Sequence, residues 1–159
     1  MMRDAKFFSF ALLPLLLGLL HCSPTGVEPL PTTSCSAIKI TDLPANSLRL
    51  DGFTLKAISI KVDTLFIEVT HGGGCKQHDY KLFMSPSVFA ESFPVQASLY
   101  LRHNANGDLC KALLQSQICF DLRPVAEQYR KFYGGLAPIR LNVYGHSAGQ
   151  QLGTLYEPR

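Results

Sequence analysis

The feature that most constrains this chain is an alternation of apolar and polar residues in short segments. Ile58, Ile60 and Val62, for example, alternate with Ser59 and Lys61. The same pattern occurs in residues 38–40, 48–51, 65–69, 80–84 and 95–102, and two last segments, 139–144 and 152–156, have the form of a closing hairpin. Because a period of two places successive side chains on opposite faces, these segments predict half-buried antiparallel strands.

One segment has helical spacing instead. Pro124 suits a first helical turn, where its missing N–H is harmless. Val125, Tyr129 and Phe132 recur at helical spacing, and the two glycines 134–135 end the pattern. Such a short helix is expected to cover an open edge or an end of a sheet. Short strands with one helix predict a mainly β domain, an antiparallel two-sheet sandwich of immunoglobulin-like kind, with a flattened β-barrel as the alternative.

The most distinctive loop is the segment HGGGCKQHDY, residues 71–80. Its three glycines let the backbone adopt conformations that a side chain would forbid. Read as a hairpin, the segment makes His71 face His78 and Val69 face Tyr80, and these pairs share one parity. The sequence therefore predicts that the two flanking strands pair with each other and direct these side chains to one face.

Composition excludes two classes of protein. Hydrophobic residues make up 47% of the 159 residues and charged residues only 17%, which excludes a disordered chain. The net charge of +3 is slight, and the chain has no cluster of lysine and arginine. We therefore expect no nucleic-acid partner.

The N-terminus has the pattern of a targeting segment. Arg3 and Lys6 precede an apolar run, residues 7–20, that is shorter than the ~20 residues needed to span a bilayer. The run has the length of a signal-peptide core. The following residues, Leu19-Leu20-His21-Cys22, resemble a bacterial lipobox, although His21 stands where such boxes carry a small residue. We expect Cys22 to be lipidated, the alternatives being a cleaved secreted protein or an uncleaved apolar anchor.

This assignment divides the chain into three parts. Residues 1–22 are predicted to be a signal peptide that ends at the lipobox cysteine. Residues 23–34 are rich in proline, serine and threonine and have no periodicity, as expected of an extended tether. Residues 35–159 are predicted to form a single β-rich domain.

Several short motifs follow one another between residues 55 and 145. They are GGGC-x-x-H-x-Y-x-L, E-S-F-P, L-x-L-x-H-N, G-D-x-C and F-D-L-x-P. This order resembles small uncharacterised bacterial lipoproteins that carry a GGC-x-x-H motif. The resemblance implies a cell-envelope location and a β-rich domain, and it brings no activity with it.

The cysteines predict two disulfides. When Cys22 is set aside for the lipid, Cys35, Cys75, Cys110 and Cys119 remain, an even number in an oxidising compartment. Three pairings are open. We favour Cys75–Cys110, because both residues lie in or beside loops at strand ends with a histidine nearby. Cys35–Cys119 follows by elimination.

The histidines suggest a metal site. By strand parity His71, His78 and His103 lie at the ends of apolar faces, with Cys75 and Asp108 near them. These donor types suit zinc or copper. The alternative is that the histidines hold no metal and only bond loop carbonyls. Because an oxidised Cys75 cannot be a ligand, the disulfide and metal hypotheses compete for one site.

The segment Gly145-His146-Ser147-Ala148-Gly149 matches the G-x-S-x-G nucleophile elbow. An elbow leads into a helix, and its acid and histidine partners come later in the chain. Only ten residues follow Gly149, and they contain Glu157 as the sole acid and no histidine. We therefore interpret residues 145–149 as a hairpin loop and predict no enzyme.

Two functions remain. The first is a non-catalytic lipoprotein of the bacterial cell envelope that faces the periplasm or the exterior. It would hold no cofactor, attach to the membrane through its N-terminal lipid, and bind an unknown protein or small-molecule partner or stabilise an assembly. The alternative is a periplasmic metal-binding protein that uses the histidines near Cys75.

Overall fold

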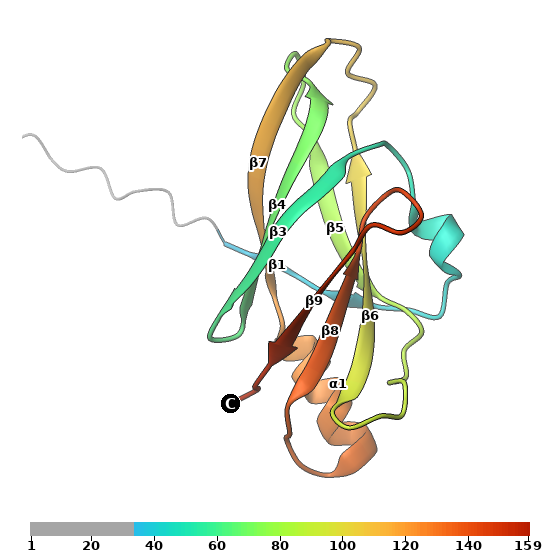
Figure 1. The fold of residues 1–159 in the computed structure, drawn as a ribbon, viewed down its shortest axis with the longest axis vertical. Coiled ribbons are helices and arrows are strands. Elements are labelled where there is room, and N and C mark those ends of the chain that lie inside the picture. The colour runs from blue at the N-terminus through green and yellow to red at the C-terminus, as the bar shows by residue number, and fades with distance from the viewer. Residues whose placement is uncertain (1–33) are drawn as a thin grey trace, which may run out of the picture. The chain divides into compact units, whose positions relative to one another are not determined.

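Two β-sheets face each other in residues 34–159, the part of the chain that this computed structural model describes (Figure 1). The predicted signal peptide, Cys22 and all of the tether except Ser34 lie outside the described residues. In chain order the elements are β1 (Ser36–Ala37), β2 (Lys39–Ile40), η1 (Ala45–Leu48), β3 (Thr54–Lys61), β4 (Thr64–Gly73), β5 (Asp79–Met84), β6 (Val95–Asn104), β7 (Ala112–Asp121), α1 (Arg123–Tyr133), β8 (Ile139–Tyr144) and β9 (Gln151–Tyr156). In these residues no helix is long and apolar enough to cross a membrane.

The first sheet has the strand order β1-β7-β4-β3 and the second the order β2-β5-β6-β8-β9. Three pairs, β1–β7, β2–β5 and β6–β8, are parallel, and the other pairs are antiparallel. The predicted two-sheet sandwich is confirmed, with mixed rather than wholly antiparallel sheets. Neither sheet closes on itself within residues 34–159, so the alternative of a barrel was wrong.

The alternating residues fill the space between the sheets. Leu65, Ile67 and Val69 of β4 are fully buried, while their neighbours along the strand are only partly covered. Leu99 of β6 and Leu141 of β8 meet them from the second sheet. Burying each side chain of this size contributes roughly 1.5–3 kcal/mol, so the alternation that predicts the strands also supplies the core.

The first two strands connect the edges of the two sheets. β1 runs parallel to the end of β7, and β2 runs parallel to the end of β5. Between them Ile38 is buried in the core. The segment from Ser36 to Ile40 therefore passes from one sheet to the other.

Helix α1 covers one end of the sandwich, as the sequence predicts (Figure 1). It buries Val125, Ala126 and Tyr129 against the core. Gly134 ends it with a φ of 74°, a left-handed conformation that glycine adopts at little cost, and its N–H donates to the carbonyl of Arg130.

One predicted strand was wrong. Residues 48–51 form no strand, because the chain makes a 3₁₀ turn at η1 just before them. The hydroxyl of Ser47 donates to the carbonyl of Pro44 (2.8 Å) and so stabilises this turn. Leu48 is nevertheless buried, so the apolar residue was correctly assigned to the core.

The predicted hairpin around the triple glycine was also wrong. β4 pairs with β3 and β7, whereas β5 pairs with β2 and β6. The residues between β4 and β5 therefore carry the chain from one sheet to the other. The side chains of His71 and His78 do face each other, as predicted. They meet across the space between the two sheets and not between two paired strands.

Candidate functional site

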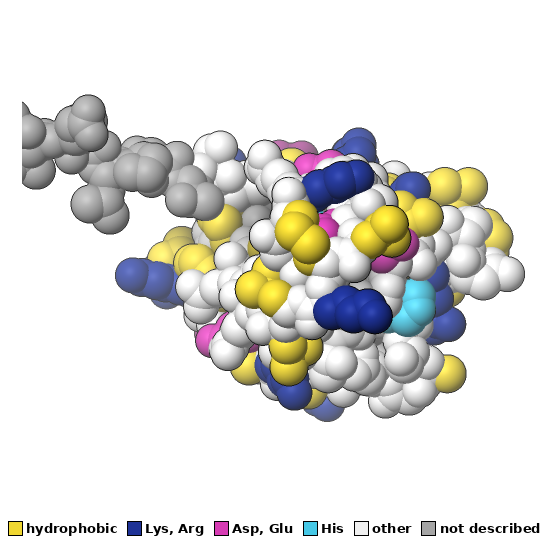
Figure 2. All heavy atoms as spheres, turned by 90° about the horizontal axis from the view of Figure 1, so that it is seen from above, with side chains coloured by type: hydrophobic (Ala, Val, Ile, Leu, Met, Phe, Trp, Pro, Cys, Tyr) yellow, Lys and Arg dark blue, Asp and Glu magenta, His cyan; other side chains and the backbone are white. Residues whose placement is uncertain are grey.

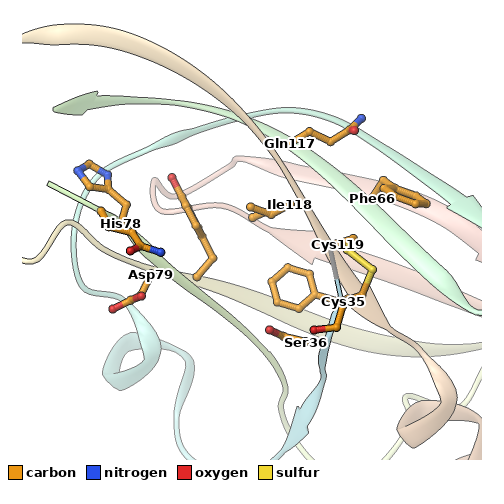
Figure 3. A pocket seen from close by; sticks show the side chains of 12 residues that line it. Cys35, Ser36, Phe66, His78, Asp79, Gln117, Ile118 and Cys119 are labelled. Carbon is orange, nitrogen blue, oxygen red and sulfur yellow. A yellow bond between two sulfur atoms is a disulfide. The ribbon is translucent and has the colours of Figure 1, made fainter. Parts of the chain in front are cut away.

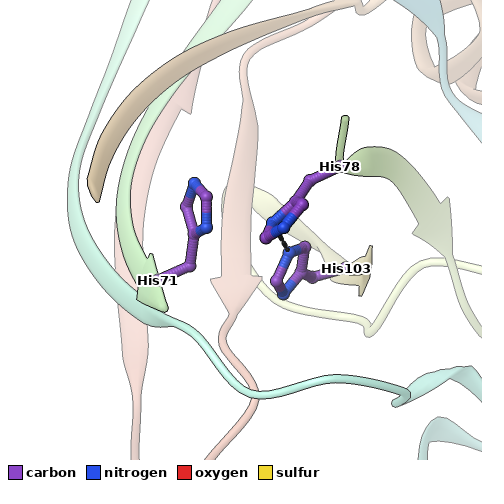
Figure 4. Close-up of side chains that lie close together, drawn as sticks. All are labelled: His71, His78 and His103. Atoms are coloured by element: carbon purple, nitrogen blue, oxygen red, sulfur yellow. Dashed lines mark hydrogen bonds between the residues drawn. The ribbon is translucent and has the colours of Figure 1, made fainter. Parts of the chain in front are cut away.

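Three histidines meet between the sheets at the end opposite α1. His71 lies near the end of β4, His103 near the end of β6, and His78 just before β5. Their ring centroids are 4.5 Å apart for His71 and His78, 4.9 Å for His78 and His103, and 5.2 Å for His71 and His103 (Figure 4). One ring nitrogen of each lies within 4.8 Å of the others. The structure thus brings together the three histidines that the sequence selects.

The cluster is shielded from solvent. His71 is 5% exposed and His103 1%. His78 is partly exposed as a residue, but its side chain is only 5% exposed. Viewed from above, this end of the domain shows one histidine patch among basic, apolar and other side chains (Figure 2). Imidazoles in such a place need hydrogen-bond or metal partners, because a buried polar group without one costs stability.

Each ring has one nitrogen bonded to an acceptor that faces away from the cluster. His71 Nδ1–H donates to the carbonyl of Gly72 (3.0 Å), and His103 Nδ1–H donates to the carbonyl of Gly52 (3.2 Å). His78 Nε2–H donates to Asp108 Oδ2 (3.2 Å). A carbonyl or carboxylate oxygen only accepts, so these contacts determine which nitrogen of each ring carries a proton.

The second nitrogen of each ring is then identified by elimination. It is Nε2 in His71, Nδ1 in His78 and Nε2 in His103. His78 Nδ1 and His103 Nε2 are 2.8 Å apart and share a hydrogen bond (Figure 4), and His71 Nε2 accepts from the Ser116 hydroxyl at 3.0 Å. The inner nitrogens of His78 and His103 thus face each other next to the carboxylate of Asp108.

Asp108 lies in a nest of backbone N–H groups. Its Oδ2 accepts from the N–H of Gly74, Cys75 and Lys76 at 2.8–3.0 Å, and its Oδ1 accepts from the N–H of Cys110 at 2.9 Å. The Cys110 and Cys75 N–H groups, the two largest contributions, hold the pKa of Asp108 well below its usual range. Asp108 is therefore a fixed negative charge that orients His78.

Gly73 is required for this arrangement. A Cβ built on Gly73 would lie 2.6 Å from the His78 ring and 2.9 Å from Asp108 Oδ2. The residue also has a φ of +138°, which side-chain-bearing residues rarely adopt. The central glycine of the loop thus allows the His78–Asp108 pair to lie against the backbone.

The two cysteine pairs that the sequence favours lie at bonding distance. Cys75 and Cys110 are joined with a Cα–Cα distance of 5.9 Å, and Cys35 and Cys119 with one of 4.9 Å. The first bridge closes the loop that surrounds Asp108. The second attaches the start of the domain to β7.

The histidine and cysteine groups are separate, contrary to the expected competition for one site. His71, His78 and His103 form one possible ligand set, and Cys75, Asp108 and Cys110 another. In the second set the sulfurs are bonded to each other and both oxygens of Asp108 accept backbone N–H groups. The three histidines are therefore the better metal ligands, and Asp108 supports them from outside.

Burial changes the pKa of two stacked rings in the cluster, His103 and Tyr80. Desolvation, the largest cause, lowers the pKa of His103, and the neighbouring His78 and His71 lower it further. Tyr80 stacks on His103 with ring centroids 4.7 Å apart, and burial raises the pKa of Tyr80 to about 12. Its buried hydroxyl has no hydrogen-bond partner among the described residues.

A groove leads to this site from the open side of the sandwich. Its volume is about 680 Å³, and its lining includes His78, Tyr80 and Ile118. Figure 3 shows His78 at one end of the groove. The groove extends to the Cys35–Cys119 disulfide. Of the three histidines, His78 is the one that lines this groove, whereas His71 and His103 lie deeper.

The GHSAG segment lies in a tight turn between β8 and β9. The N–H of Gly145 donates to the carbonyl of Gln150 (2.9 Å), and the strand β9 follows directly. The nucleophile elbow needs a helix at that point. The geometry of residues 145–156 is therefore that of a hairpin.

Sequence reasoning missed several partners of the histidines. Ser116 and the carbonyls of Gly52 and Gly72 all bond imidazole nitrogens. Asp108 was expected to lie nearby, but its nest of amides was not foreseen. Backbone acceptors leave no signal in a sequence, and a single serine in a strand gives none that distinguishes it.

The chain matches no protein-family model and no curated protein. Among solved structures it is similar to a NigD-like immunity protein from Bacteroides caccae, with 17% identity and a TM-score of 0.51 over 79% of this chain and 64% of that one. A protein from Parabacteroides distasonis, provisionally described as toxin-related, has 21% identity and a TM-score of 0.53 over 77% and 61% of the two chains. A protein from Bacteroides fragilis, provisionally described as a lipoprotein, has 10% identity and a TM-score of 0.48 over 79% and 70%.

At these identities the likeness shows the fold alone. The chain spans less than two thirds of the length of the first two structures. The two neighbours with TM-scores above 0.5 come from bacteria. The GGC-x-x-H motif is not shown in them.

Proposed function

We propose that this protein is an extracytoplasmic β-sandwich protein that binds one divalent transition metal, zinc or copper, through His71, His78 and His103. The observation that carries the proposal is the orientation of the three rings. Each donates its outer N–H to a carbonyl or carboxylate oxygen and keeps its other nitrogen for the cluster. Histidines that bind metals are almost always held in this way, because the outer bond fixes the tautomer and the ring direction.

The proposed ligand atoms need only a small movement. Two nitrogens bound to one tetrahedral zinc at ~2.0–2.1 Å lie about 3.3 Å apart. His78 Nδ1 and His103 Nε2 are 2.8 Å apart, so the two rings have to separate slightly. His71 Nε2 exchanges its bond from the Ser116 hydroxyl for the metal. The ion takes the place of the hydrogen bond between His78 and His103.

The donor set favours particular metals. Three neutral imidazoles suit zinc and copper, whereas calcium and magnesium prefer oxygen ligands. Three protein ligands also leave a fourth position on a tetrahedral ion. The groove beside His78 and Tyr80 supports access of water or an external ligand to that position.

Equilibrium titration of metal-free protein with Zn²⁺ and Cu²⁺ tests the proposal. We expect one ion per chain. Replacement of His71, His78 or His103 by alanine should weaken binding by at least ~100-fold, because loss of a group that only hydrogen-bonds a ligand already costs up to that much. His146→Ala is the matched control, because His146 lies outside the cluster. Absence of binding to wild-type protein, or equal binding by all four variants, would contradict the proposal.

The cellular location is the second part of the proposal. The apolar segment, residues 7–20, with Cys22 after it supports export and lipidation, and the two disulfides suit an oxidising compartment. Mass spectrometry of the mature N-terminus should find a diacylglyceryl group on Cys22. A mature protein that begins elsewhere without lipid would contradict the anchor and leave the metal site unaffected.

A further inference from the structure

We propose that the Cys75–Cys110 disulfide controls the metal affinity of the three-histidine site, so that reduction of this bond releases the ion. The inference rests on the proposed function. It concerns a bond that lies outside the ligand set and acts through Asp108.

Asp108 is the connection between the disulfide and the site. One of its oxygens, Oδ2, accepts from His78 Nε2 and from the N–H groups of Gly74, Cys75 and Lys76. The other oxygen accepts from the N–H of Cys110. Both halves of the disulfide therefore donate a backbone hydrogen bond to the carboxylate that orients a metal ligand.

The bridge determines the shape of this nest. Without it, Cys75 and Cys110 belong to two separate segments. Cys75 follows three glycines, two of which end β4, and Cys110 precedes β7. Glycine loses more backbone entropy on ordering than any other residue, so a glycine-rich loop without a cross-link has the strongest tendency to leave the folded position. When the N–H groups of residues 74–76 move away from Asp108, the carboxylate is no longer fixed and His78 loses its orienting partner.

The bridge is also accessible to a reductant. Cys75 is exposed and Cys110 is half-buried. A dithiol donor attacks one sulfur through a thiolate, forms a mixed disulfide, and is released as its own cyclic disulfide. The two electrons and two protons of the donor become the thiols of Cys75 and Cys110, and no other atom is exchanged.

The other disulfide provides an internal comparison. Cys35–Cys119 lies at the other end of the groove from His78 and joins the start of the domain to β7 (Figure 3). Its loss should therefore leave the histidine cluster in place. We therefore expect loss of Cys75–Cys110 to weaken metal binding more than loss of Cys35–Cys119.

The test is a competition titration with Zn²⁺ of wild-type protein, Cys75→Ser/Cys110→Ser and Cys35→Ser/Cys119→Ser, all as folded full chains. Serine pairs avoid a thiol reductant and remove thiolates that would themselves bind zinc. We expect the first double variant to bind ~10- to 100-fold more weakly, the usual effect of losing an outer-shell partner. The second should bind within twofold of wild type.

Asp108→Asn tests the proposed connection with the disulfide intact, and it should weaken zinc binding to a similar degree. If the serine pair at 75 and 110 does not fold, zinc-loaded wild-type protein treated with a phosphine reductant should transfer its metal to a colorimetric chelator while its circular dichroism is retained. Three results would overturn this inference. They are equal zinc affinity of wild type and the two serine double variants, tighter zinc binding after reduction, and unchanged zinc binding by Asp108→Asn. A wild-type protein that binds no zinc while oxidised would overturn the proposed function instead.

Discussion

The two ends of the sandwich close the same core by different chemistry. At one end α1 places Val125, Ala126 and Tyr129 over the sheets. The rings of Phe89 and Tyr129 pack there with their centroids 5.6 Å apart. At the other end three imidazoles, a carboxylate, a glycine loop and a disulfide fill the corresponding place. Apolar side chains dominate the helix end, with one side-chain hydrogen bond from Gln128 of α1 to the carbonyl of Ser87. The histidine end is closed by buried polar groups. Burying these groups costs more desolvation free energy than burying aliphatic side chains in the same place.

This difference separates stability from function. A fold that needs only closure can achieve it with apolar residues, as the helix end does. A buried network of polar groups is stable only when every group has its hydrogen-bond partner. Natural proteins accept the stability cost of such networks mainly at functional sites. The comparison therefore supports the proposed function at the histidine end and predicts that changes at the two ends have different consequences.

The largest expected effect on stability is at the helix end. Tyr129→Ala removes a buried ring that packs on Phe89 and Tyr133, and it should lower the free energy of unfolding by about 3 kcal/mol. Zinc affinity of the folded variant should remain that of wild type. Lys131→Ala, on the exposed side of the same helix, is the control and should change stability by less than ~0.5 kcal/mol. Urea unfolding with and without Zn²⁺ measures both quantities, and a large loss of affinity in Tyr129→Ala would remove the separation of the two ends.

At the histidine end, Gly73→Ala should affect both properties. The added methyl group meets the His78 ring, and the backbone conformation is unfavourable for alanine, so we expect a loss of about 1–3 kcal/mol together with weaker metal binding. Gly72→Ala is a matched control, since no atom lies within 4 Å of its added Cβ. Thermal unfolding and zinc titration of the two variants compare neighbouring positions. Equal behaviour of the two would show that Gly73 does not support the cluster.

The two ends also differ in what the sequence reveals. Period-two alternation identified β3, β4, β5 and β6 and the faces that they bury, because half-buried strands must alternate. It did not identify which strands pair, since parity gives the face of a residue and not its partner. The loop after β4 therefore had the appearance of a hairpin, although it crosses between sheets.

The candidate site was predictable only in part. Parity placed His71, His78 and His103 at the inner ends of their strands, and the structure brings them together. The acceptors that orient the rings are backbone carbonyls and a loop aspartate whose position depends on long-range folding. Asp108 acquires its role from four N–H groups on two separate segments, which no local pattern encodes.

A smaller effect concerns pH. Burial lowers the pKa of His103 below its ordinary value of 6.5, so the unfolded chain binds this proton more readily than the folded protein does. The stability of the metal-free protein should therefore decrease as the pH falls through the ordinary histidine range, and it should be constant above it. Urea midpoints between pH 5 and pH 8 measure this slope for wild type and for His103→Gln, with saturating zinc as a further condition. An unchanged slope in His103→Gln would show that another group is responsible.

The smallest effect is expected in the β8–β9 turn. Ser147 is exposed, and only its backbone carbonyl takes part in the turn, where it accepts from the N–H of Gln150 at 3.2 Å. Ser147→Ala should change the free energy of unfolding by less than ~0.5 kcal/mol and leave zinc binding intact. A fluorophosphonate probe should leave Ser147 unlabelled. Covalent labelling at this serine would instead indicate a nucleophile and a third functional region.

Anomalous diffraction from crystals of the zinc-loaded protein tests the central claim most directly. The account predicts one strong peak at the zinc edge, about 2.0–2.1 Å from His71 Nε2, His78 Nδ1 and His103 Nε2, with the His78–His103 hydrogen bond replaced by the ion. The outer bonds to Gly72, Gly52 and Asp108 should be retained. Fully loaded crystals that keep the His78–His103 hydrogen bond and show zinc only on the surface would contradict the account.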